Sequence, residues 1–276
     1  MDQTIYDVVI IGGGPAGLSA ALYASRGGLK TLVLEQGAPG GKLLLTAEIE
    51  NWPGTMMAKG FELAKEMEDH ALAFGAELKW GVVEGIEDPE AEIKKVTTMD
   101  ETFLTKAIIL ATGTLERHLG IPGEEEYRGR GVSYCAVCDG AFFRGKKIHV
   151  IGGGNTAFEE GHYLTQFASQ VDIFMRRDVS RADQIQIDRV KANPHIAVHV
   201  HMKPQEILGD ENGVTAVRYK HALTGEESVI ETDGVFPFIG VDPVSKLYQD
   251  LDLGLVDERG YVITNERMET KVPGLF

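Results

Sequence analysis

Short runs of aliphatic residues, each followed by a glycine turn and an amphipathic stretch, recur along the chain. The first run, Tyr6–Ile11, leads into the turn Gly12–Gly17, and Leu18–Ala24 then has helical character. A second apolar run, Thr31–Leu34, ends at Glu35. Apolar runs of this length are typical of strands buried on both faces of a parallel sheet. The pattern predicts strand, turn, helix and strand, which is the opening of an α/β fold.

The same pattern returns 140 residues later. Lys147–Ile151 predicts a strand, Gly152–Ala157 a turn, Phe158–Phe167 a helix and Gln170–Met175 the next strand. An internal repeat of a βαβ unit indicates two domains of the same architecture.

Between the repeats the periodicity changes several times. Phe61–Phe74 carries apolar residues at helical spacing, whereas Gly40–Lys42 and Asn51–Gly54 are rich in turn residues. Trp80–Glu84 and Thr97–Phe103 have the composition of strands in a small antiparallel element. The helix positions expected in the core are Leu63, Met67, Ala71 and Phe74.

Two later apolar runs, Ala107–Ala111 and Asp233–Gly240, predict further buried strands. The first ends at Thr112–Gly113, and we expect the loop through Pro122–Gly123 to cross between domains. At the end of the sequence, Leu275–Phe276 has the composition of the start of a strand.

The two glycine turns have the patterns G-x-G-x-x-G and G-x-G-x-x-A. Glycines in this pattern permit a tight turn and let a pyrophosphate approach the backbone at the start of the helix. Glu35 lies 23 residues after Gly12, where an acid can hold ribose hydroxyls. Strand, helix and acid together make the first turn a predicted nucleotide site.

The second repeat differs from the first where Glu35 stands. Arg176 and Arg177 take the equivalent place, 24 residues after Gly152, and Arg181 follows on the next loop. An acid at this place suits a free ribose, whereas arginine suits a 2′-phosphate. A solvated basic turn is the alternative, but the position within the repeat favours a site for NADP(H).

The two cysteines of the chain, Cys135 and Cys138, form a C-x-x-C pair followed directly by Asp139. Such a pair can close a short disulfide, and its first thiol can have a lowered pKa at a helix start. The alternative is half of a structural zinc site, which would need a second cysteine pair or two spaced histidines that the sequence lacks. The pair therefore indicates redox chemistry, and Asp139 fits either a helix cap or a proton donor.

Three histidines lie in one strand-like segment: His195, His199 and His201. His199 and His201 could share a face and invite a metal-site hypothesis. No carboxylate or cysteine lies at ligand spacing, so a solvated strand face is the favoured interpretation.

Composition and charge narrow the class of protein. Hydrophobic residues make up 43% and charged residues 25%, as in an ordinary globular chain of one or two domains. The net charge of −15 argues against nucleic acid and anionic membranes as partners. Met1–Thr4 is not the basic start of a signal peptide, and no apolar stretch is long enough to span a bilayer. Two cysteines are too few for a disulfide scaffold, so a reducing compartment fits better.

Taken together, these motifs resemble the low-molecular-weight, bacterial-type thioredoxin reductases, in the same order and over the whole chain. The matching stretches are Gly12–Gly17, Glu48–Gly54, Ala111–Gly113, Cys135–Gly140, Gly152–Glu160, Arg176–Asp178 and Arg181.

The resemblance implies an α/β fold of two Rossmann-like nucleotide-binding domains, each a parallel sheet with helices and a small antiparallel element. Residues 1–116 and 244–276 would form the FAD-binding domain, and residues 117–243 the NADPH-binding domain with the cysteines. The crossings near residues 114–120 and 241–247 would act as a hinge for rotation of one domain.

The resemblance also implies the roles of the central residues. Electrons would pass from NADPH to FAD, then to a Cys135–Cys138 disulfide, and then to the disulfide of thioredoxin. Cys138 would lie nearest the flavin, and Cys135 would attack the partner's disulfide. Asp139 would move the proton, and Asn51 would lie near the isoalloxazine ring.

Two sets of cofactor contacts follow from the resemblance. Those for FAD are Gly12, Gly14, Pro15, Ala16, Gly17, Glu35, Gly41, Lys42, Asn51, Ala111, Thr112 and Gly113. Those for NADPH are Gly152, Gly154, Asn155, Thr156, Ala157, Arg176, Arg177 and Arg181. The family further implies a cytoplasmic homodimer with thioredoxin as its partner.

The sequence departs from the family pattern in three places. Lys42 stands where the family usually has Gln, and Met175 stands where it usually has His. The family continues for several tens of residues past Phe276, through a Gly-Asp turn against the flavin and a closing helix. We therefore expect the flavin site within this sequence to be incomplete.

Two other functions stay open at this point. One is a related flavin disulfide reductase that acts on another protein disulfide or takes electrons from another donor. Peroxiredoxin-reductase flavoproteins carry an additional N-terminal redox module, whereas the flavin motif here begins at Val8. The other is a non-catalytic flavin-binding protein, which the intact C-x-x-C-D motif argues against.

Overall fold

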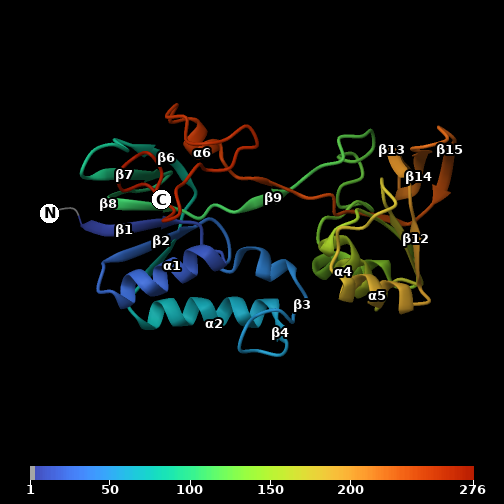
Figure 1. Ribbon diagram of the computed structural model, residues 1–276, viewed down its shortest axis with the longest axis horizontal. Helices are drawn as coiled ribbons and strands as arrows, with labels where there is room; N and C mark the ends of the chain where they lie inside the picture. Colours follow the sequence, from blue (N-terminus) through green and yellow to red (C-terminus); the bar gives the residue numbers. More distant parts are fainter. Residues whose placement is uncertain (1–3) are drawn as a thin grey trace. The chain divides into compact units, whose positions relative to one another are not determined.

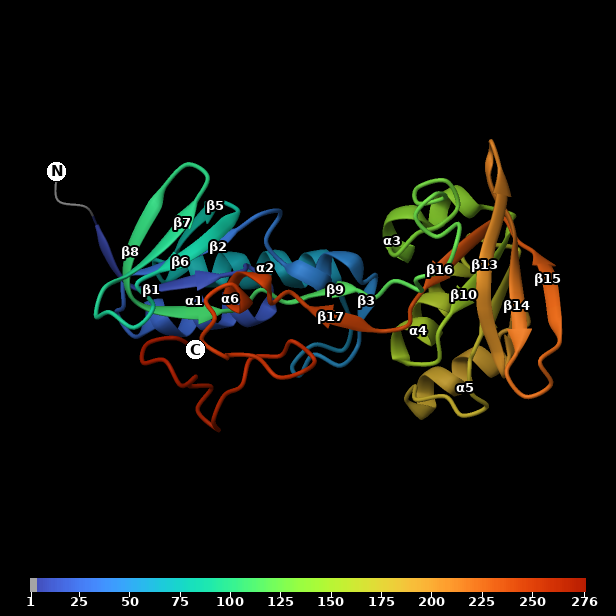
Figure 2. The same cartoon turned by 90° about the horizontal axis from the view of Figure 1, so that it is seen from above.

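The computed structural model describes residues 4–276, so the expectation about a leader at Met1–Thr4 lies outside the described residues except for Thr4. The chain separates into two compact units. The first unit comprises the residues up to Leu115 and those from Asp242 to the end, and the second unit comprises Glu116–Val241. Figures 1 and 2 show the elements of each unit from two directions.

A six-stranded sheet forms the centre of the first unit, in the order β5-β2-β1-β8-β7-β6. β1 (Ile5–Ile11) pairs in parallel with β2 (Thr31–Glu35) and with β8 (Thr102–Leu110). The helices α1 (Pro15–Arg26) and α2 (Gly60–Ala73) lie side by side on one face of the sheet (Figure 1). The predicted strand, turn, helix and strand are confirmed, because continuous apolar runs suit strands covered on both faces.

The antiparallel part of this sheet is present, but its predicted boundaries are wrong. β5 (Glu77–Trp80) pairs in parallel with β2, whereas β6 (Val83–Glu87) and β7 (Lys94–Thr98) form an antiparallel hairpin beside β8. The predicted strand Trp80–Glu84 therefore spans the end of β5 and the start of β6. The predicted strand Thr97–Phe103 likewise contains the turn between β7 and β8, which the amide of Thr98 closes on the carbonyl of Glu101.

The helix predicted over 61–74 forms, but one of its four expected core positions is wrong. Leu63 and Ala71 are buried and Met67 is half-buried, whereas Phe74 is 44% exposed. Because α2 ends at Ala73, the side chain of Phe74 leaves the buried face and lies against the ring of His70.

The other side of the sheet is covered by residues that come from far along the chain. α6 (Lys246–Gln249) and the segment after it lie there (Figure 1), and Tyr248, Leu255 and Val272 belong to the same buried cluster as Ile108. At the end of the sequence, Leu275 pairs in parallel with Ile108, as the strand-like composition predicted.

In the second unit, four parallel strands form a sheet in the order β12-β11-β10-β16. These strands are β10 (Lys147–Ile151), β11 (Gln170–Phe174), β12 (Ile196–His199) and β16 (Gly234–Pro237). α4 (Asn155–Leu164) follows the glycine turn directly, so the predicted helix 158–167 starts and ends three residues too late. The repeat seen in the sequence is thus a repeat of the fold.

A three-stranded antiparallel sheet completes the second unit, in the order β13-β14-β15. Its strands are β13 (Met202–Asp210), β14 (Gly213–His221) and β15 (Glu227–Glu231). Ile207, Val217 and Tyr219 from this sheet are fully buried in one cluster with Phe174 and Val235. The fold class expected from the resemblance, two parallel sheets with helices and antiparallel additions, is confirmed.

The chain passes between the two units in β9 (Thr114–Glu116) and in β17 (Val241–Pro243), and these two strands pair with each other. The remaining elements are η1 (Gly41–Leu45), β3 (Glu48–Ile49), β4 (Ala58–Lys59), α3 (Ala136–Asp139), η2 (Gly140–Phe143) and α5 (Gln184–Ala192). Among residues 4–276, none of the helices has the length and apolar character that a membrane span requires.

Candidate active site

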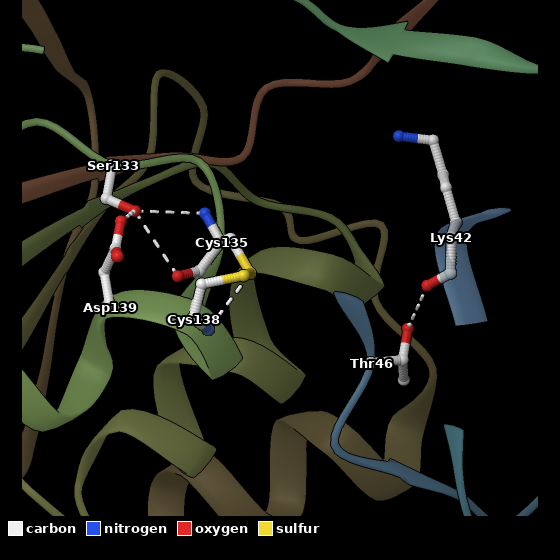
Figure 3. The surroundings of a disulfide bond; sticks show 6 residues. All are labelled: Lys42, Thr46, Ser133, Cys135, Cys138 and Asp139. Carbon is white, nitrogen blue, oxygen red and sulfur yellow. Dashed lines mark hydrogen bonds between the residues drawn. A yellow bond between two sulfur atoms is a disulfide. The ribbon is translucent and has the colours of Figure 1, made fainter. Parts of the chain in front are cut away.

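A disulfide joins Cys135 and Cys138 at the start of α3 (Figure 3). Cys135 is the N-cap residue of this short helix, and its Sγ accepts a hydrogen bond of 3.1 Å from the amide of Cys138. Cys135 is half-buried and Cys138 is exposed. An amide aimed at Sγ would stabilise a thiolate on Cys135 after reduction, which suits a dithiol that exchanges with another disulfide.

Asp139 is the last residue of α3, so the helix-cap interpretation is wrong for this helix. Within residues 4–276 its carboxylate caps no amide at the start of η2 either. Instead, Oδ2 of Asp139 accepts a 2.6 Å hydrogen bond from the hydroxyl of Ser133 (Figure 3). Because a carboxylate beside a dithiol can exchange a proton with it, the arrangement supports the proton-transfer interpretation.

Ser133 was not among the residues singled out from the sequence. Its Oγ accepts a hydrogen bond from the amide of Cys135 at 3.1 Å and lies 3.3 Å from the carbonyl oxygen of the same residue. A serine two positions before the cap of a helix often turns its hydroxyl to the local backbone, and this signal was available in the sequence.

The segment that leads to Cys135 is held by a second group missed in the sequence. The buried carboxylate of Glu124 accepts hydrogen bonds from the amides of Leu119 and Gly120, both at 2.7 Å, and from the hydroxyl of Tyr134 at 2.6 Å. Burial and this hydrogen bond raise the pKa of Tyr134 above its ordinary value. Tyr134 therefore stays protonated and ties the residue before Cys135 to the loop.

The first glycine turn lies at the carboxyl ends of β1, β2 and β8. A Cβ on Gly12 would collide with the carbonyl oxygen of Ala111, and a Cβ on Gly17 would collide with that of Gly12. Only glycine permits these backbone approaches, and they bring the predicted stretch Ala111–Gly113 beside the turn.

Glu35 is fixed beside the same turn. Its Oε2 accepts a 2.6 Å hydrogen bond from the amide of Gly13, and its Oε1 accepts one of 2.9 Å from Gly37. A carboxylate has about four acceptor positions, so two remain for ribose hydroxyls. Gly41 also lies here, because the amide of Gly40 donates to the carbonyl of Gly13.

The two remaining predicted flavin contacts, Lys42 and Asn51, follow Gly41 in the first unit. Lys42 lies in η1, where its carbonyl accepts a hydrogen bond from the hydroxyl of Thr46 (Figure 3). Asn51 lies exposed between β3 and β4, and within residues 4–276 it makes no hydrogen bond to the glycine turn.

The second glycine turn repeats the close packing of the first. A Cβ on Gly152 would collide with the carbonyl oxygen of Phe238 and would lie 2.9 Å from Cβ of Ala157. Asn155 and Asp183 exchange two hydrogen bonds, of 2.9 and 2.6 Å, which hold the start of α4 to the loop before α5.

Both helix starts fit an anionic group. α1 and α4 follow glycine N-caps, Gly14 and Gly154, and among the described residues 4–276 no side chain caps either helix. Neither helix has an acidic residue in its first turn. The unpaired amides and the helix dipole are then directed at the place where a pyrophosphate would lie.

A pocket of about 330 Å³ opens beside the second glycine turn and is lined by all three predicted arginines, Arg176, Arg177 and Arg181. The amide of Arg181 donates to the carbonyl of Gly153 at 2.7 Å, so its loop is anchored to the turn. Two further cations line the pocket, Arg117 and Lys203, and no periodic pattern in the sequence marks them. Positive charge at this place suits a phosphate ester.

Met175, the departure from the family pattern, also lines this pocket. Its side chain is buried and lies 3.5 Å from the position of a Cβ on Gly153. The apolar part of the pocket suits an adenine ring, and the cationic side chains at its edge suit a phosphate on the ribose.

The three histidines do not form a metal site. His199 lies 2.8 Å from a carboxylate oxygen of Asp172, and His201 lies beyond β12 with a φ of 60°, so the two do not share a strand face. Within the described part of the chain, no cluster of three metal-ligating side chains occurs.

Comparison with known proteins agrees with this geometry. The sequence matches the family described as "Pyridine nucleotide-disulphide oxidoreductase" over residues 6–276. The thioredoxin reductase of Listeria innocua is 47% identical over 275 residues, which cover 100% of this chain and 85% of that protein. The thioredoxin reductase of Bacillus subtilis is 46% identical over 275 residues, with 100% of this chain and 86% of that protein covered.

A solved structure shows the same likeness. The crystal structure of Lactococcus lactis thioredoxin reductase superposes with a TM-score of 0.96 at 49% identity and covers 98% of this chain and 88% of that chain. With its two glycine turns, its arginine-lined pocket and its disulfide, the chain belongs to the pyridine nucleotide-disulphide oxidoreductase family.

Proposed function

We propose that the protein is an NADPH-dependent thioredoxin reductase. Electrons pass from NADPH through FAD to the Cys135–Cys138 disulfide and from there to the disulfide of thioredoxin. The observation that carries this proposal is the Cys135–Cys138 disulfide, closed at the N-cap of α3 with Asp139 beside it. The relatives that are named thioredoxin reductases support the choice of substrate.

The two nucleotide sites divide between the two units. The turn Gly12–Gly17 in the first unit would hold FAD, with Glu35 to bind its ribose and Ala111–Gly113 beside the turn. In the second unit, Gly152–Ala157 and the arginines that follow β11 would hold NADPH. When bound, FAD supplies the two-electron relay between a nicotinamide and a disulfide.

The domain assignment follows from this division. The proposed FAD-binding domain consists of residues 1–116 and 244–276, and the proposed NADPH-binding domain of residues 117–243. We further propose that β9 and β17, through which the chain passes between the units, act as the hinge.

The dithiol chemistry is performed by the chain's own side chains. The thiolate of Cys135 attacks a sulfur of the substrate disulfide, and a mixed disulfide forms while the substrate's S–S bond breaks. Cys138 then attacks Sγ of Cys135, which restores the disulfide and releases the second substrate thiolate. Asp139 takes the proton of the Cys138 thiol and passes it to a departing thiolate. The other substrate thiolate takes a proton from solvent, which balances the proton that Cys135 released when it became a thiolate.

The setting of the enzyme follows from the same chemistry. A dithiol that turns over needs a compartment where thiols are kept reduced, which supports the cytoplasm. The net charge of −15 disfavours nucleic acid as a partner. The homodimer is part of the proposal and is checked by light scattering of the purified protein.

An anaerobic titration tests the function. NADPH is added to the flavin-loaded protein while the visible flavin bands are followed, and thioredoxin is then added in its disulfide form. We expect NADPH to bleach the bands and thioredoxin to restore them, as each thioredoxin disulfide takes up two electrons and becomes a dithiol. Bleaching without reoxidation by thioredoxin would point to another disulfide substrate, and no bleaching would point to a flavin-binding protein without this activity.

A further inference from the structure

The hydroxyl of Ser133 connects the two chemical groups of the redox site. It lies 2.6 Å from Oδ2 of Asp139 and accepts the amide proton of Cys135 at 3.1 Å. Ser133 is only 6% exposed, so its hydroxyl is largely shielded from bulk water. The side chain thus links the carboxylate at the end of α3 to the backbone at its start.

The direction of these bonds follows from the chemistry of a hydroxyl. Oγ has a single proton to donate, and the amide of Cys135 already occupies one of its acceptor positions. Two acceptors are in reach: the carbonyl of Cys135 at 3.3 Å and the carboxylate of Asp139 at 2.6 Å. A separation of 2.6 Å is typical of a hydroxyl that donates a hydrogen bond to an ionised carboxylate. The hydroxyl of Ser133 therefore donates to Asp139 and keeps its proton.

An open pocket reaches the same side chain. Asp139 and Ser133 line an open pocket of about 460 Å³, together with the exposed ring of Phe142. The charged side chains on the pocket wall are Arg130, Lys146, Asp210 and Asp233. Protons can therefore exchange between Asp139 and solvent without passing the sulfur atoms.

We propose that Ser133 is the positioning residue of the proton-transfer step. Its hydrogen bond holds one oxygen of the Asp139 carboxylate and so fixes the side chain, which leaves the other oxygen to accept and return the proton. The inference rests on the proposed reductase function and goes beyond it, because it assigns a role to a residue outside the C-x-x-C-D motif.

The electron and proton balance of the exchange step shows why the position of the Asp139 carboxylate matters. As the electron pair of the dithiol moves to the substrate, the Cys135–Cys138 bond forms and the substrate S–S bond breaks. Two protons must move from the cysteine thiols to the substrate sulfurs. Asp139 accepts and returns one of them, the other is exchanged through solvent, and Ser133 keeps its own proton throughout.

Three variants test the role. Ser133→Ala removes the hydroxyl, and Ser133→Thr keeps it. Thr232→Val is the matched control: Thr232 is also buried in the second unit, accepts the amide of Gly234 and donates to its carbonyl, but does not contact Asp139. The flavin-loaded enzyme is reduced anaerobically, and its reoxidation is followed by stopped flow.

We expect Ser133→Ala to slow reoxidation by thioredoxin about tenfold, the loss typical of one hydrogen bond to a charged group. Reduction by NADPH stays unchanged, Ser133→Thr recovers most of the rate, and Thr232→Val behaves as wild type. Addition of Ser133→Ala to Asp139→Asn produces no further slowing, because the serine acts through the carboxylate.

Other outcomes overturn the inference. Three outcomes would show that Ser133 has only a structural role. They are equal slowing in Ser133→Ala and Thr232→Val, equal loss of rate in both half-reactions, and additive effects of Ser133→Ala and Asp139→Asn. If wild type fails to reduce thioredoxin, the proposed function is wrong, and the same comparison is made with glutathione disulfide as oxidant after reduction with dithiothreitol. The Ser133 effect is then read from the rate of thiol loss.

Discussion

At the scale of single residues, Glu160 is a buried carboxyl that the redox chemistry does not use. It lies on α4 with 8% exposure, and within residues 4–276 its Oε2 has no hydrogen-bond partner. Burial raises the pKa of Glu160 to about 8, and the negative charge of Glu159 adds to the effect. The carboxyl is therefore protonated in the folded protein at neutral pH.

From the raised pKa of Glu160 we predict that the stability of the protein falls as the pH rises. Between about pH 4.5, the ordinary value, and about pH 8, the folded protein holds a proton that the unfolded chain has released. Stability therefore falls as pH rises through this window, by about 1.4 kcal/mol per pH unit and a few kcal/mol in total. Glu160→Gln should flatten this slope in urea unfolding measured at pH 5 to 8.

A matched control separates burial from charge. Glu226→Gln removes an exposed carboxyl in the turn between β14 and β15 and should leave the slope as in wild type. If Glu160→Gln keeps the wild-type slope, the carboxyl is already ionised in the folded protein.

The two cysteines differ in their surroundings, and this difference can be measured. Sγ of Cys135 accepts an amide proton at the start of α3, as expected of the thiol that attacks the substrate. Cys135→Ser should leave Cys138 as a thiolate beside the flavin, with a broad long-wavelength absorption band that the Cys138→Ser protein lacks. The opposite pattern of bands would exchange the two roles.

At the residue scale, the sequence predicted the chemical groups but not what holds them. Cys135, Cys138 and Asp139 stand out by type and spacing. Glu124 does not, because its role comes from hydrogen bonds to backbone amides that only the folded loop brings together. Ser133 has a local signal, a hydroxyl two residues before the helix cap, but its contact with Asp139 appears only in the fold. Residue type predicts chemistry, whereas orientation depends on contacts.

At the scale of elements, both βαβ units were predictable because apolar runs and glycine turns are strong local signals. The ends of the helices and strands were less predictable. The turn at Gly81, between β5 and β6, lies inside a run that reads as one strand, and its amide bonds to the carbonyl of Glu35 far along the chain. Local composition does not show the end of a strand when that end is set by pairing with a strand far away in the sequence.

The loop after β11 leads to a prediction about coenzyme choice. Arg176 and Arg177 line the pocket beside the second glycine turn, and a 2′-phosphate is the part of NADPH that NADH lacks. Arg176→Ala combined with Arg177→Ala should raise KM for NADPH roughly 100-fold, since hydrogen bonds between charged groups contribute about 1.5–3 kcal/mol each. KM for NADH and the FAD content should stay unchanged in steady-state kinetics and absorbance spectra.

The control for this variant lies in the same unit. Arg144→Ala removes an exposed arginine that packs on Phe167, away from the pocket. It should leave both KM values as in wild type. A wild-type protein that uses NADH as readily as NADPH would mean that the arginines are only a solvated turn.

At the scale of the whole molecule, each unit has buried clusters of its own. Ile148, Val150 and Phe236 lie in a cluster confined to the second unit, whereas Val9 and Ile108 lie in one confined to the first. The internal repeat predicted two domains of the same architecture. It did not predict that the last part of the chain covers the first sheet, because that pairing joins residues far apart in sequence.

Separate cores predict that a coenzyme stabilises one unit at a time. NADP⁺ at about 100 times its Kd should slow local opening near its site about 100-fold, equivalent to about 2.7 kcal/mol. Hydrogen exchange followed by mass spectrometry on the flavin-loaded protein should show this protection at residues 152–157 and 176–181. Exchange at the turn 12–17 should stay the same, because a different set of buried residues supports it. NAD⁺ at the same concentration is the control and should protect neither turn, since it lacks the phosphate that the arginines bind. Equal protection of both turns by NADP⁺ would show that the two units open together.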